Sequence, residues 1–196
     1  MGDFSNYQTI TSIKEILDNL DLSSDTINLN NNNIKKARFD KLPERIVNVY
    51  ANDNIIDEIH WDDRNWNIIS VKNNNFEPIQ FEGLKCNNFI LDDNNIKEIT
   101  FIDCVFEKLS IQNNLISSIN FFDCHIKDLD LSSNKIKQII TLPHGLVKLN
   151  CFGNKLRCIE TEFHDDIEYL DLSDNKLTSL RNIPTGLKYF DLANNS

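Results

Sequence analysis

One asparagine recurs along almost the whole chain at a nearly constant interval. The intervals between successive copies are 22, 20, 20, 20, 20, 20, 21 and 20 residues. Nine copies in phase predict a chain that follows the same path many times, so we interpret the sequence as a stack of similar windings. The nine positions are Asn32, Asn54, Asn74, Asn94, Asn114, Asn134, Asn154, Asn175 and Asn195.

The residues around each asparagine also repeat. Apolar residues stand five and three positions before it, as in Ile27 and Leu29 or Leu170 and Leu172. This period of two predicts a short strand with one buried face. The asparagine then turns the chain, and we expect its side chain to bond backbone groups of its own and the adjacent winding. The result would be an asparagine ladder inside the stack.

The segment 129–136 reads LDLSSNKI and contains the pattern LxLxxNxI. It resembles the leucine-rich repeat family, whose pattern is LxxLxLxxNxL. The resemblance implies an α/β-type repeat solenoid, mostly β, with a parallel sheet on the concave side of an arc. Repeats this short leave little room for convex helices, so we expect extended or 3₁₀ segments there. The segments PHGL at 143–146 and PTGL at 184–187 are similar to the short repeats of bacterial effectors. The middle repeats depart from that pattern, so no effector role is inferred.

A second column of residues is expected to fill the core. Seven positions after the asparagine, the early repeats carry aromatic residues, whereas the later ones carry Thr141 and Thr161. We expect the aromatic column to form a buried spine. Its members are Phe39, Trp61, Phe81, Phe101 and Phe121.

The length of 196 residues fits a single domain in two parts. Residues 1–24 form an N-terminal segment with a capping helix at about 11–20, where Ser12 and Glu15 match a capping box. Residues 25–196 hold nine leucine-rich repeats, of which the last is incomplete and uncapped. An uncapped final strand would leave an open sheet edge.

Composition argues against several classes of partner and compartment. The net charge of −10 repels phosphate backbones and anionic lipids, so we expect neither nucleic acid nor membrane as a partner. The sequence shows no signal peptide and no apolar run of the ~18 residues that span a bilayer. The five cysteines form no CxxC pair, which favours a reduced protein without disulfides. We therefore predict an intracellular, cytoplasmic location.

The chain offers little for catalysis or cofactor binding. It contains no GxSxG, P-loop or GxGxxG motif, and we expect no catalytic residues and no cofactor. Ten positions after the asparagine, Cys104, Cys124, His144 and His164 form one column with the composition of a zinc site. Ligands of one zinc ion lie within ~4 Å of each other, whereas four successive windings span roughly 14 Å. We therefore expect no metal site there.

The exposed face of the predicted sheet is the best candidate for a functional surface. Residues six, four and two positions before each asparagine would share that face, and we call them the −6, −4 and −2 rows. Aromatic and acidic residues gather in these rows near the C-terminus, a composition typical of interface hot spots. The alternative is that the aspartates are ordinary parts of the LDLSxN repeat and are kept for solubility. We call this set the C-terminal patch: Phe152, Tyr169, Tyr189, Asp130, Asp171, Asp191 and Lys148.

These features lead to one main functional hypothesis and two alternatives. The main hypothesis is a non-catalytic module that binds another protein, with a partly basic surface, through the concave face of the arc. The first alternative is a structural or self-assembling scaffold that uses its open ends, for example a homodimer through the uncapped C-terminal edge. The second is the substrate-recognition arm of a larger enzyme.

Overall fold

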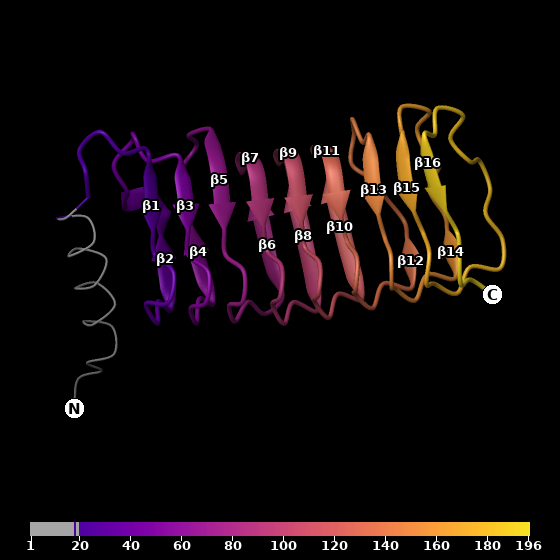
Figure 1. The fold of residues 1–196 in the computed structure, drawn as a ribbon, viewed down its shortest axis with the longest axis horizontal. Coiled ribbons are helices and arrows are strands. Elements are labelled where there is room, and N and C mark those ends of the chain that lie inside the picture. The colour runs from indigo at the N-terminus through magenta and orange to yellow at the C-terminus, as the bar shows by residue number, and fades with distance from the viewer. Residues whose placement is uncertain (1–17, 19) are drawn as a thin grey trace.

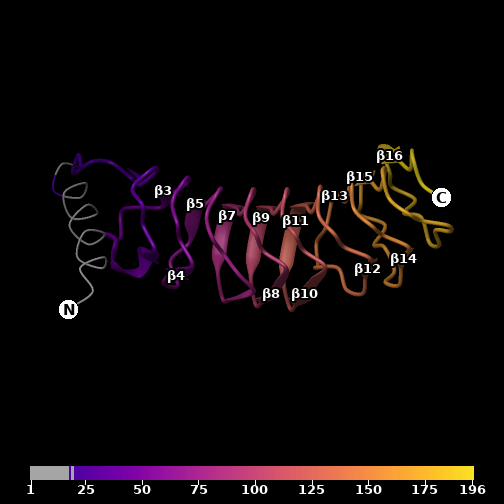
Figure 2. The same cartoon turned by 90° about the horizontal axis from the view of Figure 1, so that it is seen from below.

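The computed structural model describes residue 18 and residues 20–196, which form a single solenoid of stacked windings (Figure 1). Every winding contributes one strand to a nine-stranded parallel sheet with the order β1-β3-β5-β7-β9-β11-β13-β15-β16. Seen from below, this row of strands dips in the middle and rises at the C-terminal end, so the sheet lies on the inner side of a shallow curve (Figure 2). The strands are β1 (Thr26–Asn28), β3 (Asn48–Tyr50), β5 (Trp66–Ser70), β7 (Lys85–Ile90), β9 (Val105–Ser110), β11 (His125–Asp130), β13 (Lys148–Asn150), β15 (Tyr169–Asp171) and β16 (Tyr189–Asp191).

The other side of the solenoid is extended, with one 3₁₀ turn, η1 (Phe39–Lys41). The extended segments also pair with each other, which the sequence analysis did not anticipate. They form small parallel sheets with the orders β10-β8-β6, β12-β14 and β2-β4. Their bounds are β2 (Lys36–Arg38), β4 (Glu58–His60), β6 (Ile79–Glu82), β8 (Glu98–Ile102), β10 (Ser118–Phe122), β12 (Gln138–Ile139) and β14 (Cys158–Ile159).

The asparagine ladder is present and follows the predicted bonding. In a middle winding, Asn114 Nδ2 donates to the carbonyl oxygens of Leu91, Ile111 and Gln112 at 3.1–3.2 Å, and its Oδ1 accepts from Ile96 N at 3.1 Å. Seven ladder residues are buried, whereas Asn32 and Asn195 at the two ends are half-buried. Each buried amide satisfies backbone groups that the turn would otherwise leave unpaired.

The core lies between the two faces and contains the predicted spine. The rings stack in sequence: Trp61–Phe81 at 5.2 Å, Phe81–Phe101 at 5.5 Å and Phe101–Phe121 at 5.6 Å between centroids. Phe39 is buried as predicted, but its ring contacts Trp66 at 6.2 Å. The buried strands and the ladder confirm that this is a mostly-β solenoid of the leucine-rich-repeat type.

The same backbone turn precedes each ladder asparagine, and the sequence analysis did not predict it. The residue before every ladder asparagine has a positive φ, from Asn31 at 59° to Asn194 at 55°. Only Asn, Asp, Ser and Gly occupy this position along the chain, and Asn, Asp and Gly are the types that adopt the left-handed region most readily. The predicted capping helix at 11–20 lies almost entirely outside the described residues.

Candidate functional site

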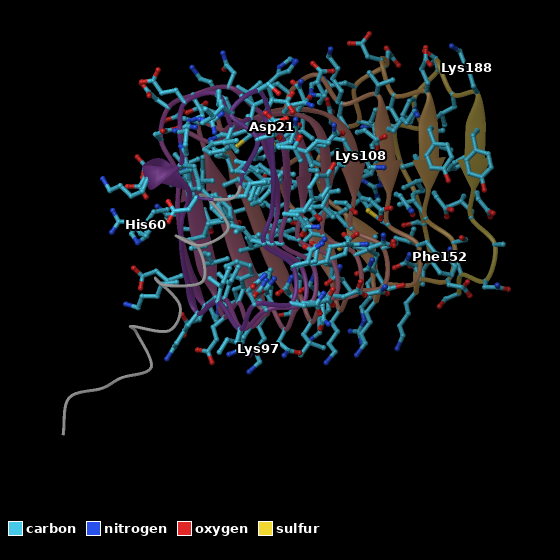
Figure 3. All side chains as sticks on the ribbon, turned by 60° about the vertical axis from the view of Figure 1, so that its left-hand side comes forward. Asp21, His60, Lys97, Lys108, Phe152 and Lys188 are labelled. Carbon is cyan, nitrogen blue, oxygen red and sulfur yellow. The ribbon has the colours of Figure 1, made fainter. Side chains whose placement is uncertain are left out.

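The strand register confirms the −6 and −4 rows, whereas the −2 residues lie beyond the strands. The expected exposure is wrong for part of the rows, since Asn48, Ser70, Asp92, Ser110, Ser132 and Ser173 are buried. Along the −6 row, Asp128 pairs with Lys148, Lys148 with Tyr169, and Tyr169 with Tyr189. Along the −4 row, Asp130, Asn150, Asp171 and Asp191 follow in order. Six of the seven residues of the C-terminal patch therefore lie on the adjacent strands β11, β13, β15 and β16, and Phe152 lies in the turn after β13. Figure 3 shows Lys108 toward the middle of the stack and Phe152 near its C-terminal end.

Tyr169 and Tyr189 form the aromatic part of the patch. Their rings stack face to face, with centroids 4.4 Å apart and planes inclined by 6°. The Tyr189 hydroxyl donates to Asp191 Oδ2 at 3.4 Å. Loss of solvation raises the pKa of both phenols, and the nearby Asp171 carboxylate raises it further. Only the Asp171 contribution reflects negative charge beside the rings.

Each of the three patch aspartates uses one carboxylate oxygen in a turn bond, and the second oxygen accepts from Asn150 in Asp130 and from Tyr189 in Asp191. Oδ1 of Asp130 accepts from the backbone N of Ser132 at 2.9 Å, and Asp171 and Asp191 accept in the same way from Ser173 at 3.0 Å and Ala193 at 2.8 Å. Asn150 makes the equivalent bond to Phe152 at 3.0 Å. This turn bond fixes each carboxylate and directs its second oxygen away from the turn.

The alternative interpretation treats these aspartates as ordinary repeat residues. The turn bond agrees with it, because one oxygen of each aspartate has a structural role in the repeat. The turn bond itself does not require the negative charge, because an asparagine makes the same bond at Asn150 and at Asn28. In the described residues, no lysine or arginine nitrogen lies within 4.0 Å of the Asp130, Asp171 or Asp191 carboxylates. The charge of this row is therefore uncompensated by ion pairs among those residues.

A hollow of about 200 Å³ adjoins the tyrosine stack on its N-terminal side. Two of its lining residues, Asp128 and Asn150, were not among the predicted site residues. Lys148 Nζ lies 4.0 Å from Asp128 Oδ2, and Asn150 Nδ2 donates to Asp130 Oδ2 at 3.2 Å. The lining residues are Asp128, Asp130, Lys148, Asn150 and Tyr169.

Phe152 is less closely integrated than the other patch residues. It is 40% exposed and stands in the −2 row, on the other flank of the aspartate row from the tyrosines. In the part of the chain that the structure describes, its ring makes no aromatic contact with Tyr169 or Tyr189. The structure therefore places Phe152 on the same face but not in the tyrosine cluster.

The predicted Cys and His column is wrong in its register. His144 pairs with His125 of the preceding winding and not with Cys124. In the middle windings, Asp103 and Asp123 make the corner turn with φ of 52° and 50°. Pro143 occupies the next equivalent position, and its ring holds φ near −65°, so the left-handed turn moves to Gly145 at 73°. No group of three or more His, Cys, Asp or Glu side chains suited to a metal occurs among residue 18 and residues 20–196.

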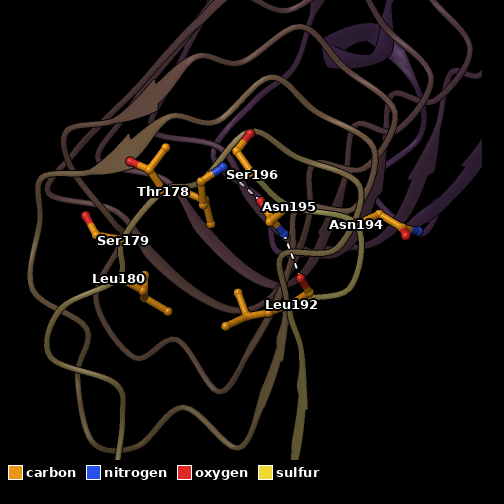
Figure 4. Close-up of a pocket in the computed structure, with 8 residues that line it drawn as sticks. Thr178, Ser179, Leu180, Leu192, Asn194, Asn195 and Ser196 are labelled. Atoms are coloured by element: carbon orange, nitrogen blue, oxygen red, sulfur yellow. Dashed lines mark hydrogen bonds between the residues drawn. The ribbon is translucent and has the colours of Figure 1, made fainter.

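A larger hollow of about 440 Å³ lies at the C-terminal winding (Figure 4). Its wall combines leucines with polar residues, and Asn195 Nδ2 donates to Leu192 O at 3.0 Å. It opens beside the core rather than on the sheet face that carries the patch. The lining residues are Leu177, Thr178, Ser179, Leu180, Leu192, Asn194, Asn195 and Ser196.

Comparison with known proteins yields similar solved structures, two of which are YopM proteins. No family model and no curated protein matches the sequence. YopM from Yersinia enterocolitica WA-314 is 18% identical, with a TM-score of 0.43 over 100% of this chain and 52% of that protein. YopM from Yersinia pestis, described as a leucine-rich effector protein, is 14% identical, with a TM-score of 0.30 over 98% of this chain and 90% of that protein. This chain thus spans about half the length of the first.

The described residues include no helix with the length and apolar character required to cross a membrane.

Proposed function

We propose that this solenoid is a non-catalytic module that binds another protein through the C-terminal patch of its inner sheet. The observation that carries the proposal is the Tyr169–Tyr189 stack, 4.4 Å between centroids, beside the aspartate row. Tyrosines supply large contact areas with few rotatable bonds, and they are enriched in interface hot spots. Tyr189 is 43% exposed and Phe152 is 40% exposed, so apolar area is available for burial.

The scaffold favours such a role because it holds the contact residues still. The patch residues on β11, β13, β15 and β16 stand on hydrogen-bonded strands, and the turn bonds fix the aspartates. A rigid surface loses little conformational entropy on binding, which leaves more of the contact energy for affinity. The excess of carboxylates over cations in the patch favours a partner with a basic surface.

The test is affinity capture from cells that express the protein, with three immobilised forms. The wild type and a Tyr50→Ala control, which removes a tyrosine from the −4 row at the other end of the sheet, should capture the same partner. The double variant Tyr169→Ala/Tyr189→Ala should lose it while its melting temperature stays close to that of the wild type. Retention of the partner by the double variant would show that the patch is not the binding surface.

A further inference from the structure

The hollow beside Tyr169 has the size of a site for one side chain. Its volume is about 200 Å³, below the roughly 300–1,000 Å³ that is usual for small-molecule pockets. One wall is the Tyr169 ring, whose neighbour in the stack is Tyr189 on the next strand. The hollow lies on the N-terminal side of that ring, toward Lys148 and Asn150, which precede Tyr169 and Asp171 in the strand register.

The charges around the hollow favour a cation. Asp128 and Asp130 line the hollow and Asp171 and Asp191 follow on the next strands, which gives four negative charges. Lys148 and Lys108, the register neighbour of Asp128, contribute two positive charges, so an excess of two negative charges remains. Asp171 and Asp191 are direct neighbours in the register, and like charges in that position are unfavourable. A cation bound near the row would relieve that repulsion.

The geometry of the hollow distinguishes an arginine side chain from a lysine side chain. A guanidinium group is planar, stacks on aromatic faces and donates several hydrogen bonds at once, whereas an ammonium group is a compact, strongly hydrated point charge. The hollow offers a flat ring on one side and the fixed carboxylate of Asp130 on the other. Asp130 Oδ2 has only the 3.2 Å bond from Asn150, so it retains acceptor capacity.

We propose that this hollow binds an arginine side chain of the partner protein, stacked on Tyr169 and hydrogen-bonded to Asp130. The inference rests on the proposed function, because it assigns one contact within the C-terminal patch. Lys148 is held toward Asp128 at 4.0 Å, so it borders the hollow and opposes the entry of a second cation. The same assignment therefore predicts opposite effects for two neighbouring substitutions.

Calorimetric titration with defined peptides tests the assignment. The probes are an alternating glycine–arginine peptide and counterparts in which lysine or citrulline replaces arginine; citrulline retains the shape of arginine without its charge. The arginine peptide should bind most tightly, and the citrulline peptide about tenfold more weakly or worse, because it lacks the charge-assisted hydrogen bonds. Equal binding of the arginine and citrulline peptides would overturn the proposal.

Substitutions locate the binding to the hollow. Asp130→Asn, which keeps the turn bond as Asn150 does, should weaken the arginine peptide roughly five- to tenfold. Lys148→Gln should strengthen it about two- to threefold by removing a repelling charge. Asp174→Asn is the matched control, because it removes the same charge from an exposed residue outside the hollow and should change little. Unchanged binding by Asp130→Asn, or preference for a glycine–glutamate peptide that Lys148→Gln abolishes, would refute an arginine site.

The two proposals can fail separately. If protein capture requires Tyr169 and Tyr189 but the arginine peptide is indifferent to Asp130, the arginine assignment is wrong and the protein-binding patch stands. If the peptide depends on Asp130 but the captured protein does not depend on the tyrosines, the hollow binds arginine, but the captured protein uses another surface and the proposed function is wrong.

Discussion

The N-terminal and C-terminal halves of the nine-stranded sheet stabilise the same backbone amide in different ways. The amide belongs to the −2 residue of each winding. In the N-terminal half its acceptor comes from the preceding winding: Asn52 N donates to Asn30 Oδ1 at 2.7 Å, and Gln112 N to Asp92 Oδ1 at 3.2 Å. The first winding differs, because Asn28 accepts from Asn30 within it, and the Asp92 amide of the fourth winding has no such acceptor among the described residues.

In the C-terminal half the acceptor belongs to the same winding. Asp130, Asn150, Asp171 and Asp191 each bond the amide two residues later at 2.8–3.0 Å. A winding of this kind does not need its neighbour to satisfy the turn. The second carboxylate oxygen of each aspartate lies outside the turn bond, although Asn150 Nδ2 donates to that of Asp130 and the Tyr189 hydroxyl to that of Asp191.

Asp92 shows the opposite use of a carboxylate on the same face. It is 2% exposed, and both oxygens are engaged: Oδ1 accepts from Ser110 Oγ at 2.6 Å, and Oδ2 accepts from Gln112 Nε2 at 3.1 Å. Lys72 Nζ lies 3.3 Å from Oδ2 and neutralises its charge. Among the described residues, Asp92 therefore uses both carboxylate oxygens in bonds across windings, whereas Asp171 bonds within its winding and its second oxygen has no hydrogen-bond partner.

The largest expected effect concerns the aromatic spine, which extends through the N-terminal half and stops at Phe121. Phe101→Ala removes a fully buried ring stacked between Phe81 and Phe121. It should lower the free energy of unfolding by about 3–5 kcal/mol. The same change at Phe152, which is 40% exposed, should cost no more than about 0.5 kcal/mol. Urea unfolding followed by circular dichroism measures both, and similar losses would contradict the assignment of Phe152 to the surface.

The next largest effect is a difference in stability between variants of Asp92 and Asp171. Asp92→Asn replaces Oδ2 with an amide that faces the donors of Gln112 and Lys72, so it should reduce the free energy of unfolding by about 2 kcal/mol. Asp171→Asn retains the bond from Ser173 N and should change stability by less than about 0.5 kcal/mol. Chemical unfolding of the two isosteric variants is the measurement. A larger loss for Asp171→Asn would show that its charge stabilises the fold.

Much of this arrangement could be predicted from the sequence because it depends on one period. The 20-residue interval places Asp130, Asp171 and Tyr169 in their rows without further information. The left-handed turn could also have been predicted, because only Asn, Asp, Ser and Gly precede the ladder asparagines. The sequence analysis did not use this restriction in residue type.

The remaining features depend on local geometry that the period does not contain. His144 leaves its expected column because Pro143 cannot adopt the positive φ of Asp123, which moves the turn to Gly145. The two capping modes depend on whether the acceptor stands in the −4 row or in the −2 row of the preceding winding. Both placements look alike in the sequence, since each puts a short polar side chain on the exposed face.

The smallest effect tests whether the outward charge of the C-terminal half is felt by the tyrosines. Desolvation and Asp171 raise the pKa of Tyr169 and Tyr189 from the ordinary value of 10.0. The folded protein then holds the phenol protons more tightly than the unfolded chain, so this contribution to stability is complete below pH ~10 and is lost as pH rises through the raised values.

Ultraviolet titration of phenolate formation should show Asp171→Asn lowering both pKa values. Asp92→Asn should leave both pKa values unchanged, because Lys72 neutralises the Asp92 carboxylate and both residues lie several windings away from the tyrosines. An equal shift in the two variants would mean that the tyrosines respond to the net charge of the protein, and the distinction between the two halves of the sheet would then not extend to their electrostatics.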